Sequence, residues 1–347
     1  MKRTRYIAAV VAAAVGLTAL AGCATSNQPG SNATGSPATS ASSDTTIMKP
    51  TTKKGPLKIA YVPVVMNTSY QLVLKGIQAE IDKNGGSKFA TLTTQAPTSN
   101  DTSLQEQPNI LETLIQQNYD AIFLATEDEK AMQPYLKAAS EKGIPVFLFN
   151  MAEISKTDPY FVTNVSADQY NASVQIADWA MSHFKTKTQV AVIEGYPGLV
   201  NTQRVDGFKN TIKKDPNLQI VASQPTDWTR AKGQTVAENI LQAHPDVKFI
   251  YGLYDEMALG AVAAIKADGR SGIAVAGYDM TQDGYTAIAA GNMAASVDTG
   301  SKQMGQLLVD QLKTFAVDGK AVPRSIPVPT KVYDASNYKT FDTTNYK

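Results

Sequence analysis

Three consecutive strand-to-helix turns between residues 222 and 280 decide the fold of this chain. The sequence reads ASQPTDWTRAKG over Ala222–Gly233, NILQAHPDVKFIYGLYDEMALGAVAAIKADG over Asn239–Gly269, and IAVAGYDM over Ile273–Met280. Each short apolar run of strand type ends in an aromatic and an acidic residue, namely Asp227 with Trp228, Tyr254 with Asp255, and Tyr278 with Asp279. In open parallel α/β sheets, ligands bind at the carboxyl ends of the strands. The stretch therefore predicts a parallel α/β sheet with a ligand site at these turns.

Each of these residues, taken alone, has a purely structural interpretation. A single tryptophan at a strand end is more often a core residue, and a single aspartate there is commonly a helix N-cap. The repetition of the same residue types at three consecutive turns favours a site.

The same alternation of strand and helix patterns continues from Leu57 to the end of the chain, which is typical of βαβ units on parallel sheets. Strands are expected at Leu57–Val65, Phe89–Thr93, Ala121–Ala125, Val146–Phe149, Phe161–Asn164, Gln189–Glu194, Gln219–Ser223, Phe249–Leu253, Ile273–Tyr278 and Ala294–Val297. Helices are expected at Tyr70–Asn84, Leu104–Asn118, Glu129–Lys142, Asp168–Phe184, Gln203–Lys214, Arg230–His244, Glu256–Asp268, Gln282–Ala290 and Ser301–Asp318. So many strands exceed one ordinary sheet, and 347 residues exceed one ordinary domain, which predicts two lobes.

The N-terminal residues indicate export and lipid anchoring. Met1–Arg5 carries three cations, Tyr6–Ala21 is almost wholly small and apolar, and Leu20-Ala21-Gly22-Cys23 follows at its end. This pattern is typical of a secretory signal peptide that ends in a lipobox, where the cysteine thiol takes a diacylglycerol. A transmembrane anchor is the alternative, but the run is short for a span of about 20 residues. We expect residues 1–22 to be removed and the protein to be anchored through Cys23 on the extracytoplasmic side of the cell membrane.

Composition narrows the class of protein further. Cys23 is the only cysteine, so no disulfide framework is expected. Residues 23–55 form a Ser/Thr/Ala-rich stretch that cannot bury enough apolar surface to fold, and we expect a flexible tether there. Lys2, Arg3 and Arg5 are the only charges in residues 1–22, so their removal takes the formal net charge from +1 to −2. No basic field remains to attract nucleic acid.

The order, spacing and residue types of these turns resemble those of the ribose-binding family, the type I periplasmic sugar receptors of bacterial ABC importers. The resemblance implies an α/β fold of two Rossmann-like lobes with parallel sheets, joined by a three-segment hinge. The N-terminal lobe would comprise residues 57–165 plus 300–329, and the C-terminal lobe residues 166–299 plus 330–347. The prolines of VPRSIPVPTKVYDASNY (Val322–Tyr338) fit an extended crossing segment rather than another helix.

The resemblance assigns ligand-binding roles to residues of the N-terminal lobe. Asn67 and Tyr70 match the Asn-Pro-aromatic-aromatic signature before the first helix, although Ser69 stands where the first aromatic usually is. Asn150 and Met151 follow the strand of GIPVFLFNM, where the family typically has Asp, often followed by Arg in ribose binders.

In the C-terminal lobe, the resemblance assigns Arg204, Trp228 and Asp279 to ligand contact, through a cation, a stacking plane and a carboxylate. An exposed helix cation is the alternative for Arg204. Tyr254 stands where the family usually has Asn, and Thr299 lies where a Gln usually ends the last strand. Asp168 matches a turn that builds the hinge and caps a helix.

Together these features predict a monomeric binding protein that closes on a small neutral carbohydrate or polyol and presents it to the ABC permease subunits. Asn150, Met151, Tyr254 and Thr299 replace family residues, which predicts a less polar pocket and a ligand other than ribose, such as another monosaccharide, a deoxy sugar or a polyol. A receptor for autoinducer-2 or another non-sugar molecule on the same fold is the alternative. The related repressors need an N-terminal helix-turn-helix, and this chain begins with a signal pattern instead.

An enzyme would need reactive groups that the sequence does not supply. His183 and His244 are the only histidines and lie far apart, so neither a metal site nor a cofactor is expected. P-loop, GxGxxG and GxSxG motifs are absent from the sequence. Glu127, Asp128 and Glu129 are more simply partners of a helix N-terminus than a catalytic pair. A carbohydrate-acting enzyme is therefore the weaker hypothesis.

Overall fold

The computed structural model describes residues 48–155 and 157–347. The predicted signal peptide, Cys23 and most of the tether lie outside the described residues. At the end of the tether, Thr51 and Lys53 donate backbone hydrogen bonds to the carbonyls of Phe315 and Ala316, at 3.0 and 2.8 Å. Within the described ranges, no helix combines the length and apolar character that crossing a membrane requires.

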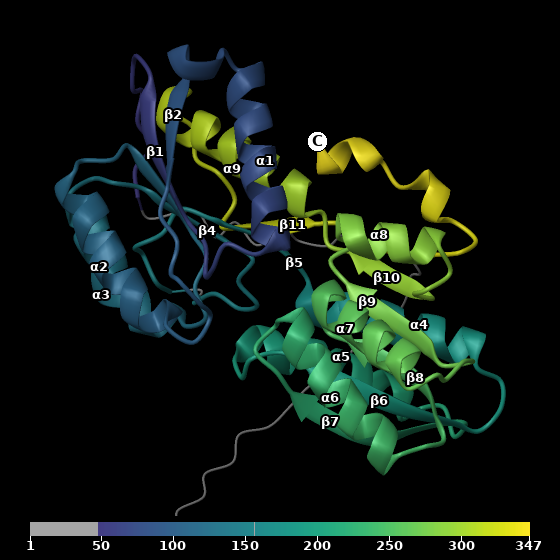
Figure 1. Cartoon of the computed structure of the whole chain (residues 1–347). Helices are drawn as coiled ribbons and strands as arrows, with labels where there is room; N and C mark the ends of the chain where they lie inside the picture. The colour runs from purple at the N-terminus through teal and green to yellow at the C-terminus, as the bar shows by residue number, and fades with distance from the viewer. Residues whose placement is uncertain (1–47, 156) are drawn as a thin grey trace, which may run out of the picture. The chain divides into compact units, whose positions relative to one another are not determined.

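The first lobe is built on a six-stranded parallel sheet with the order β11-β5-β4-β3-β1-β2 (Figure 1). Its strands are β1 (Leu57–Val62), β2 (Ala90–Thr94), β3 (Ala121–Leu124), β4 (Val146–Phe149), β5 (Asn164–Ala167) and β11 (Ser325–Val328). Apolar residues of α1 (Thr68–Lys83) and α9 (Ser301–Leu312) form the core on one face, and those of α2 (Ser103–Gln116) and α3 (Glu129–Glu141) form it on the other. The central strands are buried on both faces, which explains their continuous apolar runs.

The second lobe repeats this plan with the strand order β12-β10-β9-β8-β6-β7. Its strands are β6 (Thr188–Glu194), β7 (Leu218–Pro225), β8 (Val247–Gly252), β9 (Ala274–Tyr278), β10 (Ala295–Asp298) and β12 (Lys331–Asp334). Only β12 is antiparallel to its neighbour in this sheet. The helices are α4 (Gln169–His183), which packs on α5 (Leu199–Ile212), and α6 (Arg230–Ala243), which packs on α7 (Asp255–Ala267), followed by α8 (Gln282–Ala289).

The chain passes between the two sheets three times: after β5, between β10 and α9, and between β11 and β12. These crossings confirm the prediction of two α/β lobes joined by three segments. The proline-rich tail supplies β11 and β12 as short extended strands, one to each sheet. It ends in 3₁₀ turns at Tyr338–Thr340 and Thr343–Tyr346.

Two glycines let α1 and α9 approach closely, although the helices are far apart in sequence (Figure 1). A Cβ atom at Gly76 would lie 1.9 Å from the carbonyl oxygen of Lys302, and one at Gly305 would lie 2.0 Å from that of Val73. The close approach holds the start of α1, which carries Asn67 and Tyr70, against the helix that follows Thr299.

Several predicted boundaries differ from those of the structure, and three of the differences are instructive. The strand expected at Phe161–Asn164 is β5, and it lies at Asn164–Ala167. The guanidinium of Arg324 donates hydrogen bonds to the carbonyls of Asp158 and Phe161 and stacks on the Phe161 ring, so this segment does not form the start of the strand. Helix α5 begins at Leu199 rather than Gln203, since the carbonyl of Gly198 already accepts from the Thr202 amide. The helix expected at Ser301–Asp318 ends at Leu312, and a π-helical turn over Lys313–Val317 follows it.

Candidate functional site

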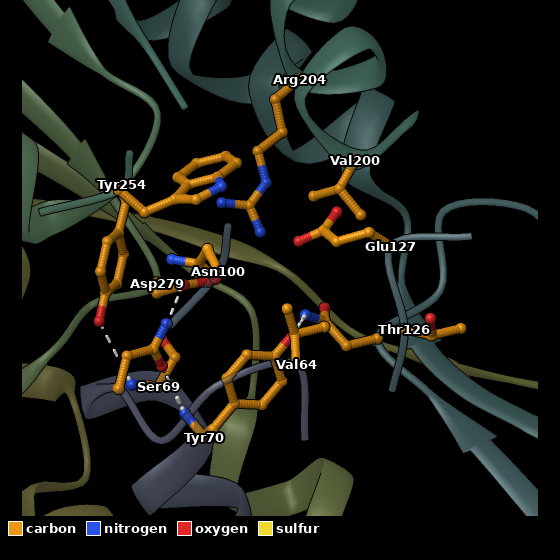
Figure 2. A pocket seen from close by; sticks show the side chains of 13 residues that line it. Val64, Ser69, Tyr70, Asn100, Thr126, Glu127, Val200, Arg204, Tyr254 and Asp279 are labelled. Carbon is orange, nitrogen blue, oxygen red and sulfur yellow. Dashed lines mark hydrogen bonds between the residues drawn. The ribbon is translucent and has the colours of Figure 1, made fainter. Parts of the chain in front are cut away.

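A polar pocket lies between the lobes, where residues at the carboxyl ends of strands from both sheets come together (Figure 2). All predicted ligand-binding residues except Thr299 line this pocket: Asn67, Tyr70, Asn150, Arg204, Trp228, Tyr254 and Asp279. Six lining residues were not predicted as ligand contacts: Val64, Ser69, Asn100, Thr126, Glu127 and Val200. The site is therefore broader on the side of the first lobe than the sequence suggested.

Arg204 is the central cation of the pocket. It projects from α5 and is only 4% exposed, so the alternative of an exposed helix cation is wrong. Its Nε donates to Gln169 Oε1 at 2.8 Å and its Nη1 to the Leu253 carbonyl at 2.7 Å. The guanidinium carbon lies 3.8 Å from the centre of the Tyr278 ring. A guanidinium has five N–H donors, so these contacts fix its orientation and still leave N–H groups for a ligand.

Asp279 is the carboxylate of the second lobe, and protein donors already occupy both of its oxygens. Ser69 Oγ, from the first lobe, donates to Oδ2 at 2.6 Å, and Thr299 Oγ1 donates to Oδ1 at 2.8 Å. Thr299 thus orients Asp279 from behind, outside the pocket lining. Asp279 has a φ of 89°, in the left-handed region that few residues other than glycine adopt, so its surroundings must hold this turn in place.

Asp255 holds the turn that carries Asp279, and it is fully buried rather than part of the pocket wall. Its Oδ2 accepts from the amide and hydroxyl of Thr281 at 2.6 and 3.1 Å, and its Oδ1 accepts from Ser296 Oγ at 2.7 Å. Burial raises the pKa of Asp255 to about 7, although these donors act in the opposite direction. The strand-end pattern of the sequence therefore included one aspartate whose role is structural.

A chain of side-chain hydrogen bonds runs from the first lobe to Arg204. Asn150 donates from Nδ2 to the Tyr70 hydroxyl at 3.2 Å and accepts at Oδ1 from Gln169 Nε2 at 2.9 Å. Gln169 in turn accepts at Oε1 from Arg204 and from the Tyr278 hydroxyl at 2.9 Å. Gln169 is buried, and the sequence interpretation did not predict that it belongs to the site. Its position directly after Asp168, the N-cap of α4, was the available sequence signal.

Asn67 and Asp168 cap helices, as their positions at strand-to-helix turns indicate. Asn67 Oδ1 accepts from the Tyr70 amide at 3.0 Å and caps α1. Asp168 accepts from the Asn171 amide at 2.9 Å and caps α4, which confirms its predicted capping role. Capping uses the side-chain oxygen of Asn67 and leaves its NH₂ group at the pocket.

Trp228 forms an aromatic wall of the pocket and depends on a glycine beneath it. A Cβ atom at Gly195 would lie 2.1 Å from the indole ring, so only glycine fits there. The Arg204 guanidinium lies 5.4 Å from the indole centre. Tyr254 is nearly buried, and its hydroxyl oxygen accepts from the Ser69 amide at 3.4 Å. The pocket therefore combines flat apolar surfaces with directed polar groups.

Glu127 is the charged residue among the pocket residues that the sequence interpretation missed. The three adjacent acids were all expected to serve the N-terminus of α3, but only Asp128 caps it, at 2.9 and 3.1 Å from the amides of Lys130 and Ala131. Glu129 accepts from the Ser155 amide at 2.9 Å, and Glu127 turns into the pocket towards Arg204 (Figure 2). Burial raises the pKa of Glu127, and the Arg204 charge acts against that shift.

Met151 differs from its prediction in another way. It was expected to replace a polar residue in the pocket, but it is buried in the core of the first lobe and does not line the pocket. In the ranges that the structure describes, no group of three or more His, Cys, Asp or Glu residues is placed to hold a metal ion.

Two α/β lobes with a polar pocket between their strand ends define a ligand-binding protein of the two-lobed type. A family model described as a periplasmic binding protein domain matches residues 59–321. The chain belongs to this family of type I periplasmic sugar-binding proteins, a family that implies export to the extracytoplasmic space.

Curated relatives and solved structures resemble the chain over most of its length. It is 33% identical over 273 residues to the ribose import binding protein RbsB of Bacillus subtilis (strain 168), covering 78% of this chain and 85% of that protein. It is 32% identical over 223 residues to the galactofuranose-binding protein YtfQ of Escherichia coli (strain K12), covering 62% and 70%. An ABC transporter solute binding protein from Agrobacterium vitis with bound D-fucose superimposes with a TM-score of 0.75 at 29% identity, covering 83% and 99%. These relatives are sugar-binding proteins rather than enzymes.

Proposed function

We propose that this protein is the solute-binding component of an ABC importer and captures a small neutral sugar or polyol in the pocket between its lobes. The observation that carries the proposal is the pocket itself, where the buried cation Arg204 and the carboxylates Asp279 and Glu127 stand beside the aromatic planes of Trp228 and Tyr70. Hydroxyls need directed donors and acceptors, and the apolar faces of a sugar ring need aromatic surfaces. The sugars named for the relatives fit the same chemistry.

Direct contacts between the lobes support a mechanism in which the lobes close over the ligand. Besides the Ser69 to Asp279 bond, Asn100 Nδ2 donates to the Asp227 carbonyl at 3.2 Å, and Thr68 Oγ1 to Glu256 Oε1 at 3.4 Å. We place the lobes at residues 57–165 plus 300–329 and residues 166–299 plus 330–347. Hinge closure of this kind gives a permease a shape that distinguishes the loaded receptor from the empty one. We propose that the protein is a monomer.

We propose a ligand other than ribose. The family places a carboxylate, often followed by a cation, after β4, and Asn150 supplies neither. The amide groups of Asn150 and the carboxylate oxygens of Asp279 also already bond to protein groups. Tyr254 adds bulk where the family has a smaller amide. A ribose hydroxyl left without a partner costs about 1 to 3 kcal/mol, so a sugar whose hydroxyls match the remaining groups should bind more tightly.

A thermal-shift screen tests both the function and the choice of ligand. The purified protein without residues 1–22 is heated with D-ribose, D-allose, D-galactose, D-fucose, a polyol series and autoinducer-2. A ligand at a hundredfold over its dissociation constant stabilises the folded state by about 2.7 kcal/mol. We expect a sugar or polyol other than ribose to give the largest rise in melting temperature. A rise with autoinducer-2 alone would favour a signalling receptor, and chemical conversion of a bound sugar would identify an enzyme.

We also propose that Cys23 carries a lipid anchor, on the basis of the Leu20-Ala21-Gly22-Cys23 sequence and the absence of any other cysteine. Two or more acyl chains anchor a protein durably, whereas one does not. Cys23→Ala should therefore abolish incorporation of labelled fatty acid and leave the protein as precursor or in the soluble fraction. Membrane fractionation of cells expressing each form checks this. A Cys23→Ala protein that loses its signal peptide yet remains in the membrane fraction would contradict the anchor.

A further inference from the structure

Most acceptor atoms of the pocket already have partners within the protein. Both oxygens of Asp279 accept from hydroxyls, Asn150 Oδ1 accepts from Gln169, and Asn67 Oδ1 accepts from the Tyr70 amide. In the part of the chain that the structure describes, no group donates a hydrogen bond to the Glu127 carboxylate. Each carboxylate oxygen can accept two hydrogen bonds, so Asp279 keeps part of its capacity, whereas Glu127 is the carboxylate of the pocket that receives no bond from the described part of the protein.

The position of Glu127 is set from both lobes. Asp128, the next residue, caps α3, so the β3–α3 turn fixes the backbone from which Glu127 projects. On the other side, a Cβ atom at Gly198 of the second lobe would lie only 3.1 Å from Glu127 Oε2. The carboxylate therefore reaches across the pocket to the start of α5, the helix that carries Arg204.

Glu127 and Arg204 point towards each other (Figure 2) but do not meet as an ion pair among the described residues. A group that fills the space between them must accept from a guanidinium and donate to a carboxylate. A hydroxyl does both, whereas a ring oxygen or a carboxylate lacks the hydrogen and a CH₂ group of a deoxy sugar lacks the oxygen.

We infer that Glu127 is a specificity-determining residue, which accepts a hydrogen bond from one hydroxyl of the bound sugar while that hydroxyl accepts from Arg204. The inference rests on the proposed sugar-binding function. It assigns to the ligand a free hydroxyl at the position that faces the β3–α3 turn, and it disfavours ligands that are deoxygenated or anionic at that position.

The first test is a cycle of protein and sugar variants measured by titration calorimetry. The sugar is the tightest binder among D-ribose, D-allose, D-galactose and D-fucose, together with its monodeoxy analogues. The proteins are the wild type, Glu127→Ala, the isosteric Glu127→Gln and the control Glu141→Gln, which changes an exposed carboxylate at the end of α3. Hydrogen bonds to charged groups correspond to about 10- to 100-fold in affinity. The affinity of Glu127→Ala should fall by that factor. One deoxy analogue should lose a larger factor in the wild type than in Glu127→Ala, because in the variant only the hydrogen bond from Arg204 remains to be lost.

Proton release supplies a second readout that a purely structural role would not change. The charged and titratable groups around Glu127 are Arg204 from α5, Tyr70 from α1 and Asp279 from the β9–α8 turn, with Asp128 and Glu129 on its own turn. A ligand hydroxyl that donates to Glu127 favours the ionised form and lowers the raised pKa of this carboxyl. Titrations over a range of acidic pH should therefore show proton release on binding at each pH where part of the free carboxyl is protonated. The binding enthalpy of the wild type should then depend on the ionisation heat of the buffer, and Glu127→Gln should show less of this dependence.

The outcomes separate the inference from the function on which it rests. Equal affinity of wild type, Glu127→Gln and Glu127→Ala for a sugar that binds would overturn the role of Glu127 and leave the sugar-binding function intact. The same conclusion would follow if every deoxy analogue lost the same factor in the wild type and in Glu127→Ala. Failure of the folded wild type to bind any of the sugars would overturn both.

Discussion

Replacement of Arg204 by methionine should weaken sugar binding at least 100-fold while the protein remains folded. Among the residues that the structure describes, Arg204 is the only cation that lines the pocket, and it stands opposite the carboxylates Glu127 and Asp279. Each hydrogen bond to a charged group contributes about 1.5 to 3 kcal/mol, and without the guanidinium the two carboxylates also lose their balancing charge. Methionine retains an apolar stem of similar length, so the loss is chiefly that of the charged head. Titration calorimetry with the best sugar from the thermal-shift screen measures the effect.

The control for this variant is Lys214→Ala, which removes an exposed cation just after the same helix. It should bind the sugar as the wild type does. Circular dichroism of Arg204→Met should match the wild type in shape, although some loss of stability is expected because the Leu253 carbonyl and Gln169 lose a donor. Binding by folded Arg204→Met within threefold of the wild type would rule out the central role of the guanidinium.

The largest expected effect on stability comes from Asp255→Ala. This substitution leaves the buried amide of Thr281 and the buried hydroxyl of Ser296 without their acceptor. An unsatisfied buried group costs about 1 to 3 kcal/mol, so the free energy of unfolding should fall by about 3 kcal/mol and the melting temperature by about 5 to 10 °C. The exposed Asp246→Asn, whose carboxylate lies just before β8, serves as the control and should leave both unchanged.

The loss of stability caused by Asp255→Ala should also depend on pH. Burial raises the pKa of Asp255 to about 7 in the folded protein, above the ordinary value of an unfolded aspartate. A raised carboxyl pKa contributes stability that is complete below the unfolded value and is lost as pH rises through the folded value. The difference in melting temperature between the wild type and Asp255→Ala should therefore be larger at pH 5 than at pH 8. A difference that grows with pH would contradict the assigned pKa shift.

The fold was largely predictable because its signals are local. Strands buried on both faces, such as β3 and β4, give short continuous apolar runs, and the helices between them keep an apolar stripe. One error arose where a distant residue decides the outcome. The strand at Phe161–Asn164 was misplaced because Arg324, far along the chain, donates hydrogen bonds to the carbonyls of Asp158 and Phe161.

The candidate site was predictable only in part, because a turn position does not reveal where a side chain points. Trp228 and Asp279 line the pocket, while Asp255, in an equivalent strand-end position, points into the protein. Three adjacent acids looked alike in sequence, yet Asp128 caps the helix and Glu127 enters the pocket. Gln169 became recognisable only once its contacts with Asn150 and Arg204 were known.

The measurement that tests the central claim most directly is a calorimetric titration of the wild-type protein, freed of residues 1–22, with D-ribose, D-allose, D-galactose and D-fucose in parallel. The claim is that the pocket between the lobes binds one small neutral sugar, and that this sugar is not ribose. We expect saturable binding of one molecule per chain, with a submicromolar dissociation constant for a sugar other than ribose and weaker binding of ribose itself. Absence of binding by all four sugars to the folded protein would contradict the sugar-binding function, and tightest binding of ribose would contradict the proposed specificity.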